Sequence, residues 1–220
     1  MDLSLSLELK TSTGRTTFED AAKGLEAFSQ GAISFDKLDP IIRREMRRFL
    51  DAIVNQMRTR HGRSWPGGTS GKSLSRRSGR LVESIAASVR VSGKFSQGGE
   101  VRGQIGSPLI YANIQEVGGT IRPTRAQYLT VPLPAALNSN GTMKFPSARH
   151  YPKTFVQRSR RGNLIIFQKQ GRSIIPLFVL KKSVRIPPRL NLGVAVAAGT
   201  KALGDRIVSQ TLRDFQAGKL

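Results

Sequence analysis

The segment from 40 to 60, PIIRREMRRFLDAIVNQMRTR, constrains the fold most, because it has the clearest periodic pattern in the chain. Apolar residues recur there every three or four positions, at Ile42, Met46, Phe49, Ile53 and Met57. This spacing places them in one stripe along a helix, and such a stripe is buried against another element. Asp39 is a good N-cap, and Pro40 suits the first helical position. We therefore predict a long amphipathic helix over 40–60.

A second long helix is predicted at 191–216. Its apolar members include Leu192, Val196, Leu203, Ile207 and Leu212. Gly199 and Gly204 each weaken a helix by ~1 kcal/mol relative to alanine, so packing has to hold this one together. A shorter helix is predicted to start at Ser78, with Leu81 and Ile85 facing inward.

Short alternating segments between the helices predict strands. The segment 88–107 alternates, breaks at SQGG and alternates again, which indicates a hairpin. The segment 163–186 predicts a second hairpin that turns near Gly171, and YLTVPLP predicts a strand that proline ends. The expected fold class is α+β: an antiparallel sheet built from hairpins, with two long helices packed on one face.

The expected organisation is one domain with an arm. Residues 1–35 are predicted to form an N-terminal arm, in which alternating leucines at 3–9 indicate a strand that pairs in an assembly. Residues 36–220 form a single α+β domain in this prediction. It carries an extended loop or hairpin insertion around 135–175, which includes a long basic loop.

The charge of the chain is strongly positive and unevenly distributed. Lys and Arg number 36 against 14 Asp and Glu, which gives a net charge of +22. No acidic residue occurs between Glu116 and Asp205, although basic residues recur throughout. Such a segment needs a polyanion, an acidic protein partner, or solvent and salt to offset its self-repulsion. DNA or RNA is one such polyanion, and a basic protein without a specific anion is the alternative.

Residues suited to catalysis are scarce. The chain has no cysteine, so thiolate chemistry and disulfides are excluded. His61 and His150 lie in basic, loop-like segments and are predicted to be surface residues, and the carboxylates are too scattered for a two-carboxylate or two-metal site. GGTSGKS lacks the strand and glycine spacing of a phosphate-binding loop. We expect no enzyme activity, cofactor or metal. We also expect no membrane partner, because no apolar run or signal peptide is evident.

A helical turn over 109–116, followed by Gly118 and Gly119, predicts a rigid corner. Glycine ends a helix at low cost, and the residue before Pro123 is extended. Tyr111 is expected to anchor this corner in the core or in an interface, and Arg122 is expected to project outward. The alternative is a plain structural corner that contacts no partner.

The order of several short motifs resembles the tail-completion, or virion-morphogenesis, proteins of tailed bacteriophages. The matching segments are G-x-x-W, SGRLVESI, YANIQEVGG and IPPR, and the resemblance as a whole covers roughly 40–215. The matching positions emphasised here are Trp65, Gly79, Leu81, Ile85, Tyr111, Glu116, Gly118, Gly119, Pro187 and Arg189. The chain departs from the family pattern at Gln115, where histidine is common, and at Leu190-Asn191 after Arg189. Its 135–175 segment is also longer than expected.

The resemblance implies a non-enzymatic structural protein. Such a protein completes the tail or joins the tail to the head at the neck, as an oligomeric ring around the DNA channel. The implied partners are copies of itself in a ring, expected to be hexameric, adjacent neck, tail-terminator or connector proteins, and genomic DNA contacted non-specifically. The implied location is the virion, after assembly in the host cytoplasm. A sequence-nonspecific nucleic-acid-binding protein outside a virion is the alternative, and a basic nuclease is a third class.

The basic loop 149–172 is the candidate surface for DNA or for an acidic neighbouring ring. The candidate side chains of this loop are Arg149, Arg158, Arg160, Arg161, Lys169 and Arg172. A solvated loop without a partner is the alternative interpretation. The arginines of the predicted 40–60 helix have the same two interpretations, phosphate contact or a solvated face.

Overall fold

The computed structural model describes residues 3–10, 34–66, 73–96 and 99–220, with only the backbone described for 3–10. The chain divides into two compact units. Unit 1 comprises Met1–Thr59, Arg80–Glu116 and Asn191–Leu220, and unit 2 comprises Arg60–Gly79 and Val117–Leu190. This differs from the predicted single domain over 36–220, because the chain leaves unit 1 after Glu116 and returns only at Asn191. The separate part is therefore longer than the predicted insertion at 135–175.

Unit 1 contains a three-stranded antiparallel sheet. Its strands are β1 (Leu3–Lys10), β2 (Arg90–Gly93) and β3 (Glu100–Ser107), in the order β1-β3-β2. The predicted hairpin in this region is the pair β2–β3, with Arg90 opposite Gln104. The predicted N-terminal strand is β1. It pairs with β3 of its own chain, whereas the prediction had it pairing in an assembly. Residues 11–33 of the predicted arm lie outside the described residues.

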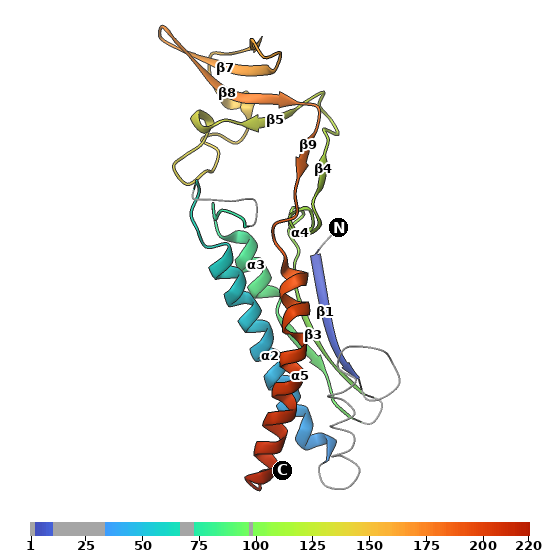
Figure 1. The fold of residues 1–220 in the computed structure, drawn as a ribbon. Helices are drawn as coiled ribbons and strands as arrows, with labels where there is room; N and C mark the ends of the chain where they lie inside the picture. The colour runs from blue at the N-terminus through green and yellow to red at the C-terminus, as the bar shows by residue number, and fades with distance from the viewer. Residues whose placement is uncertain (1–2, 11–33, 67–72, 97–98) are drawn as a thin grey trace. The chain divides into compact units, whose positions relative to one another are not determined.

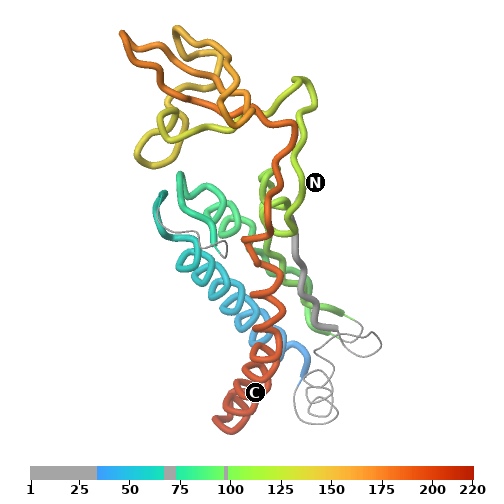
Figure 2. The backbone as a smooth tube through the Cα atoms, turned by 45° about the horizontal axis from the view of Figure 1, so that its top comes forward, coloured from blue at the N-terminus to red at the C-terminus, as the bar shows by residue number. Residues whose placement is uncertain are grey.

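Within the described residues, four helices belong wholly or mainly to unit 1: α2 (Phe35–Arg60), α3 (Arg80–Ser88), α4 (Ala112–Val117) and α5 (Leu192–Gln216). Figure 1 shows α2, α3 and α5 beside β3, and Figure 2 shows α2 and α5 running side by side. The helix α2 begins five residues before the predicted start, so Pro40 lies inside it. The predicted N-cap is therefore wrong, and the Asp39 carboxylate instead accepts a hydrogen bond from the Phe95 N–H at 2.6 Å.

The predicted apolar stripe of α2 is confirmed, since all five of its residues are buried. The helix lies so close to the sheet that a Cβ on Gly103 of β3 would come within 2.7 Å of the Met46 Sδ. A Cβ on Gly199 of α5 would lie 2.5 Å from Phe49 Cε2 of α2. Gly199 thus weakens the helix as an isolated element, but it permits the close approach of the two long helices.

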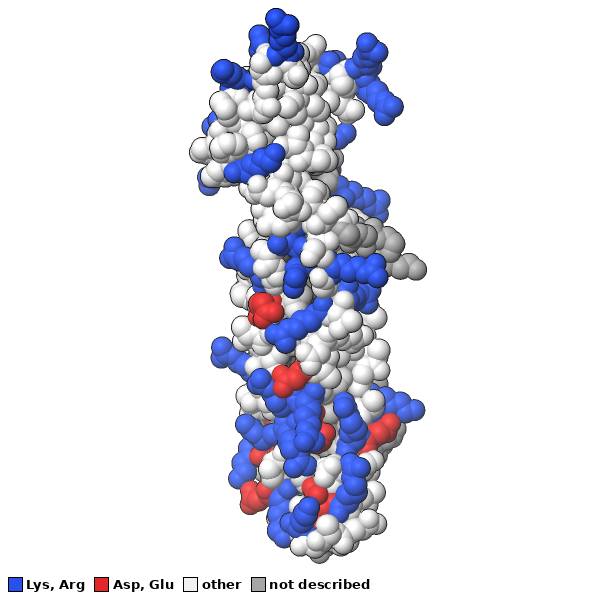
Figure 3. Space-filling model, turned by 90° about the vertical axis from the view of Figure 1, so that its left-hand side faces the viewer, with Lys and Arg blue, Asp and Glu red and all other residues white. Residues whose placement is uncertain are grey.

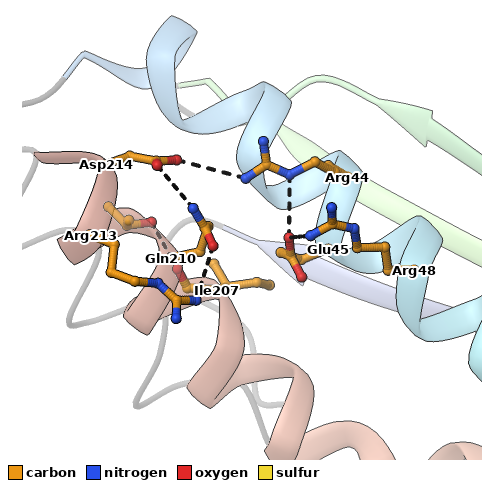
Figure 4. Close-up of polar contacts among 8 residues, drawn as sticks. Arg44, Glu45, Arg48, Ile207, Gln210, Arg213 and Asp214 are labelled. Carbon is orange, nitrogen blue, oxygen red and sulfur yellow. Dashed lines mark hydrogen bonds and ion pairs between the residues drawn. The ribbon is translucent and has the colours of Figure 1, made fainter. Parts of the chain in front are cut away.

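A polar cluster joins the same two helices (Figure 4). The Glu45 side chain, only 4% exposed, accepts hydrogen bonds from Arg48 at 2.9 Å and from Arg44 at 3.3 Å. The Arg44 guanidinium also lies 3.7 Å from the Asp214 carboxylate of α5. A buried carboxylate is tolerated when it is paired in this way, so these arginines of α2 serve the fold of unit 1. Their predicted contact with phosphate stays a prediction.

Unit 2 contains two further antiparallel sheets. The strands β4 (Gly119–Ile121) and β9 (Val184–Ile186) form a pair. The other sheet has the order β5-β8-β7-β6, built from β5 (Leu129–Pro132), β6 (Thr154–Arg158), β7 (Leu164–Gln170) and β8 (Ser173–Lys181). Two short 3₁₀ turns, η1 (Pro134–Ala136) and η2 (Ala148–His150), complete the unit. The predicted hairpin turn is confirmed at Gly171, whose φ is +60°.

One small hydrophobic cluster forms the core beneath the four-stranded sheet. Its buried members are Ala136, Tyr151, Leu177 and Phe178, and the Tyr151 hydroxyl donates a hydrogen bond to the Ala136 carbonyl at 2.7 Å. The predicted basic loop over 149–172 is wrong in form, because β6 and β7 occupy half of it. The pairing of β6 with β7 gives the backbone of both strands hydrogen-bond partners and orders this segment.

The predicted α+β class is confirmed, with antiparallel sheets and a long C-terminal helix. The strands form three sheets within the described residues, where the sequence predicted one. Across those residues, no helix has the length and apolar character needed to cross a bilayer.

Candidate interaction surfaces

Glu116, the last residue of the predicted helical turn, caps the N-terminus of α5. Its two carboxylate oxygens accept hydrogen bonds from the Leu192 N–H at 2.8 Å and from the Gly193 N–H at 2.9 Å. The residue in the N-cap position, Asn191, has a φ of +55° and makes no side-chain cap hydrogen bond. A carboxylate at a helix N-terminus satisfies free N–H groups and complements the helix dipole. Glu116 therefore replaces the missing local cap from 76 residues away.

The two glycines after Glu116 bring two motif segments together in unit 2. Gly118 has a φ of +74°, and a Cβ there would lie 2.8 Å from Pro188 Cδ and 3.0 Å from the Ile186 carbonyl oxygen. Gly119 begins β4 and pairs with Ile186 at the end of β9. The QEVGG and IPPR segments, far apart in the sequence, are thus paired, with a position at Gly118 that only glycine fits without strain.

The corner exposes its apolar side chains. Tyr111 is 41% exposed and Ile110 is 84% exposed. The prediction that Tyr111 anchors the corner in the core is therefore wrong. The physical reason is that Ala112, not Tyr111, occupies the fully buried position at the start of α4. The alternative, that Tyr111 anchors an interface, stays a prediction. Arg122 is exposed, as predicted.

The other motif residues have structural surroundings. Ile85 of α3 is completely buried and Leu81 is half-buried, which agrees with their predicted inward orientation. Gly79 has a φ of +78° just before α3. In unit 2, Pro187 is exposed and Arg189 is half-buried.

Trp65 packs against two other segments of unit 2, at Gly141 and at Arg77. Its ring lies against Gly141, where a Cβ would come within 2.6 Å of Trp65 Cδ2. The Arg77 guanidinium lies 5.7 Å from the centre of the Trp65 ring, at cation–π distance. The tryptophan motif thus holds a loop of unit 2 in place.

His61 is buried, at 3% exposure, and the prediction of a surface histidine is wrong for it. Its Nδ1 accepts a hydrogen bond from the Leu74 N–H at 3.0 Å, and its Nε2 lies 3.1 Å from the Leu190 carbonyl oxygen. Since Nδ1 accepts a hydrogen bond, the ring proton is on Nε2, and this N–H donates a hydrogen bond to the Leu190 carbonyl. The ring is therefore a neutral bridge between two backbone segments. His150 is exposed, as predicted.

Charge is segregated between the two units. Unit 2 holds 19 of the 36 Lys and Arg residues and none of the 14 Asp and Glu residues, so its formal charge is +19. Unit 1 holds the other 17 basic residues and all 14 acidic ones, which leaves it at +3. Figure 3 shows one face of the molecule, where acidic side chains occur only among the basic side chains of unit 1. The positive charge of unit 2 therefore has no carboxylate within the unit to offset it.

Unit 1, in contrast, neutralises its charges locally. Arg47 lies 3.1 Å from Asp51, and Arg58 lies 3.1 Å from Glu83. Lys94 lies 2.8 Å from Asp36, and the hydrogen bond and negative charge of that carboxylate raise the pKa of the lysine. Such exposed pairs contribute little stability, but they leave this unit with little net charge to attract a polyanion.

The predicted basic side chains all lie in or beside the four-stranded sheet, and all are exposed. Arg158 ends β6, and its guanidinium donates a hydrogen bond to the Gly162 carbonyl at 3.0 Å. Arg160 and Arg161 lie in the turn between β6 and β7, while Lys169 and Arg172 flank the β7–β8 turn. Arg149 lies in η2. The structure thus spreads them over both ends of a sheet, where the sequence predicted one loop.

The described part of the chain contains no group of three or more His, Asp or Glu residues that could hold a metal ion.

Gln115, which replaces the histidine of the resembled pattern, has a buried Oε1 without a hydrogen-bond partner among the described residues. Such a group costs stability, typically ~1–3 kcal/mol.

Sequence reasoning missed two features of these surfaces. The cap by Glu116 has no local signal, because its partners lie 76 residues away. The other feature is that both faces of the four-stranded sheet carry apolar side chains. This feature did have a signal, since LIIF and IIPLFVL are continuous apolar runs rather than alternating ones. Comparison with family models, with curated proteins and with solved structures found no match to this chain.

Proposed function

We propose that this chain is a structural component of a tailed-phage virion that completes the tail or joins it to the head. In this proposal, copies of the chain form a ring around the DNA channel at the neck and contact adjacent neck or connector proteins. The chain performs no reaction. The order of the motifs that resemble tail-completion proteins supports this assignment.

The observation that carries the proposal is the segregation of charge. A unit with 19 basic residues and no acidic residue repels other copies of itself unless anions lie between them. Several such units around a channel become compatible when DNA phosphates or acidic neighbours neutralise them. Unit 1, at +3, has no such barrier and is the part suited to contact between copies.

The exposed apolar side chains of unit 1 are suited to contacts between copies. Ile110 and Tyr111 precede α4, and Val194, in the first turn of α5, is 64% exposed. Apolar side chains that stay exposed in one copy are buried when a neighbour covers them. A head-to-tail ring gives each copy the same covered surface.

Electron micrographs of particles made with and without the chain test the proposal. The phage that encodes it is grown with the gene intact and with the gene deleted. We expect the deletion to leave separate heads and tails, or tails with unfinished ends. Infectious, fully joined particles without the chain would refute the assignment.

The same positive charge is also compatible with a sequence-nonspecific nucleic-acid-binding protein outside a virion. That alternative predicts monomers or dimers on duplex DNA, with an affinity that falls steeply as salt rises. It predicts no density at the head–tail junction and no effect of the deletion on particle assembly.

A further inference from the structure

The four-stranded sheet of unit 2 has apolar side chains on both faces, and the core cluster covers only one. Ile166 and Ile175 pack against that cluster. Because side chains alternate along a strand, Phe167 and Ile165 of β7 lie on the opposite face. An extra residue at Leu177 in β8, seen as a register shift, lets Leu177 and Phe178 both face the core.

We call the uncovered side the outer sheet face. Its apolar residues include Val131, Phe155, Ile165, Phe167, Ile174 and Val179. The rings of Phe155 and Phe167 stack at 5.8 Å on it. Ile174 is 56% exposed and Phe155 is 36% exposed. Such a continuous apolar face on a sheet marks a contact surface.

Basic residues surround the outer sheet face at both ends. The β6–β7 turn at one end carries Arg160 and Arg161, and Lys182 follows β8 at the same end. At the other end, Lys169 lies on the face itself, opposite Ile174, and Arg172 lies in the β7–β8 turn. These side chains are exposed, and no carboxylate belongs to unit 2.

We propose that the outer sheet face docks a protein partner whose contact surface is apolar at its centre and rich in Asp and Glu around it. The apolar centre of such a partner covers Phe155 and Ile174, and its carboxylates meet the basic ends of the sheet. Charge complementarity of this kind sets the choice of partner and its orientation. The proposal concerns only the chemistry of the partner, so it goes beyond the virion assignment and does not depend on it.

The same features disfavour other occupants. DNA offers phosphates and sugars to a surface, so the apolar centre would stay unused. A second copy would bring another +19 unit against the same face. A bilayer takes up apolar side chains at protruding tips, but the tips of these hairpins carry Arg160, Arg161 and Arg172.

Binding to two anionic polymers tests the proposal on the full chain. The probes are polyglutamate and a random copolymer of glutamate and tyrosine, compared at about 0.3 M salt, where simple charge attraction is weakened. We expect the copolymer to bind at least about tenfold more tightly, because it offers both apolar groups and carboxylates. The double variant Phe155→Thr and Ile174→Thr is expected to lose this advantage.

Val156→Thr is the matched control. Val156 is in the same strand as Phe155 and is 57% exposed, but it is paired with Ile166 and so faces the other way. The control is expected to keep the advantage of the copolymer. Equal affinity of the wild-type chain for both polymers would overturn the proposal, as would an equal loss in the control.

The other occupants are separate outcomes of the same experiment. We also measure self-association, binding to duplex DNA and binding to vesicles of phosphatidylglycerol. If one of these is lost in the double variant and kept in the control, that occupant replaces the acidic protein partner and the proposal is overturned. If the double variant does not fold, Ile174→Thr alone replaces it, since this residue is 56% exposed on the same face. It is expected to abolish the copolymer advantage, and an unchanged advantage would overturn the proposal.

Discussion

Glu116 provides the sharpest test of how the start of α5 is held in place. Its carboxylate accepts two hydrogen bonds, from the N–H groups of Leu192 and Gly193, at the start of a 25-residue helix. A hydrogen bond to a charged group contributes about 1.5–3 kcal/mol net, and the helix dipole adds about 0.3–1 kcal/mol. Water replaces part of this in a variant, so we expect Glu116→Ala to destabilise the chain by about 2–4 kcal/mol.

Glu116→Gln separates the charge from the shape of the side chain. The amide retains one acceptor oxygen but turns an NH₂ group toward the second N–H donor, so we expect a loss of about 1–2 kcal/mol. Glu83→Ala is the control, because Glu83 is 64% exposed and pairs with Arg58 at the surface. Its removal is expected to cost less than about 0.5 kcal/mol.

Urea unfolding gives the free energies, and hydrogen exchange at the Leu192 and Gly193 amides gives the local effect. Both amides are expected to exchange faster in Glu116→Ala and to remain unchanged in Glu83→Ala. A Glu116→Ala variant that is no less stable than Glu83→Ala, with unchanged exchange at both amides, would refute the role of Glu116 as the cap of α5.

Three further predictions concern packing and charge. Gly199→Ala is expected to lower the melting temperature by a few degrees, because its Cβ would lie 2.5 Å from Phe49 Cε2 and this clash outweighs the ~1 kcal/mol by which alanine favours a helix. A higher melting temperature would contradict the observed helix packing. Gln115→Met is expected to leave stability unchanged or raise it by up to about 1 kcal/mol, because it removes a buried oxygen without a described partner; a loss above 1 kcal/mol in urea unfolding would show that this oxygen is satisfied. If unit 2 contacts DNA phosphates, the double variant Arg160→Gln and Arg161→Gln lowers the salt dependence of duplex binding by up to about two counterions, whereas an unchanged slope in a fluorescence titration would remove these residues from the contact.

The long helices could be predicted from the sequence, because their burial follows from local spacing. The stripe from Ile42 to Met57 is buried as predicted, and α5 covers the predicted residues. The start of α2 could not be placed, since Pro40 is tolerated within its first turns and the helix extends back to Phe35. The role of Gly199 could not be predicted either, because the space for a side chain at this position is set by Phe49 of another helix.

Features that depend on distant backbone groups could not be predicted. His61 is buried because it bridges Leu74 and the carbonyl of Leu190, which is 129 residues away. Glu116 caps a helix that begins 76 residues later. The basic segment 149–172 is predicted as a loop, because residues 135–160 are rich in Ser, Asn, Gly, Pro and basic residues. Its short apolar runs form β6 and β7 through pairing with each other and with β8.

The candidate surfaces could be predicted in composition but not in arrangement. The sequence alone indicated a basic segment without acidic residues, and that segment makes up most of unit 2. The continuous apolar runs LIIF and IIPLFVL indicate an apolar second face, but the sequence does not indicate that the basic residues lie at both ends of the same sheet. That arrangement follows from strand register and from the extra residue at Leu177, which have no signal in the sequence.

Negative-stain electron microscopy of the purified chain tests the central claim most directly. If this protein is a positively charged building block that assembles with its own copies, images show closed rings of uniform diameter around an open centre. Images that contain only single particles of monomer size, in the presence and in the absence of duplex DNA, would contradict the account.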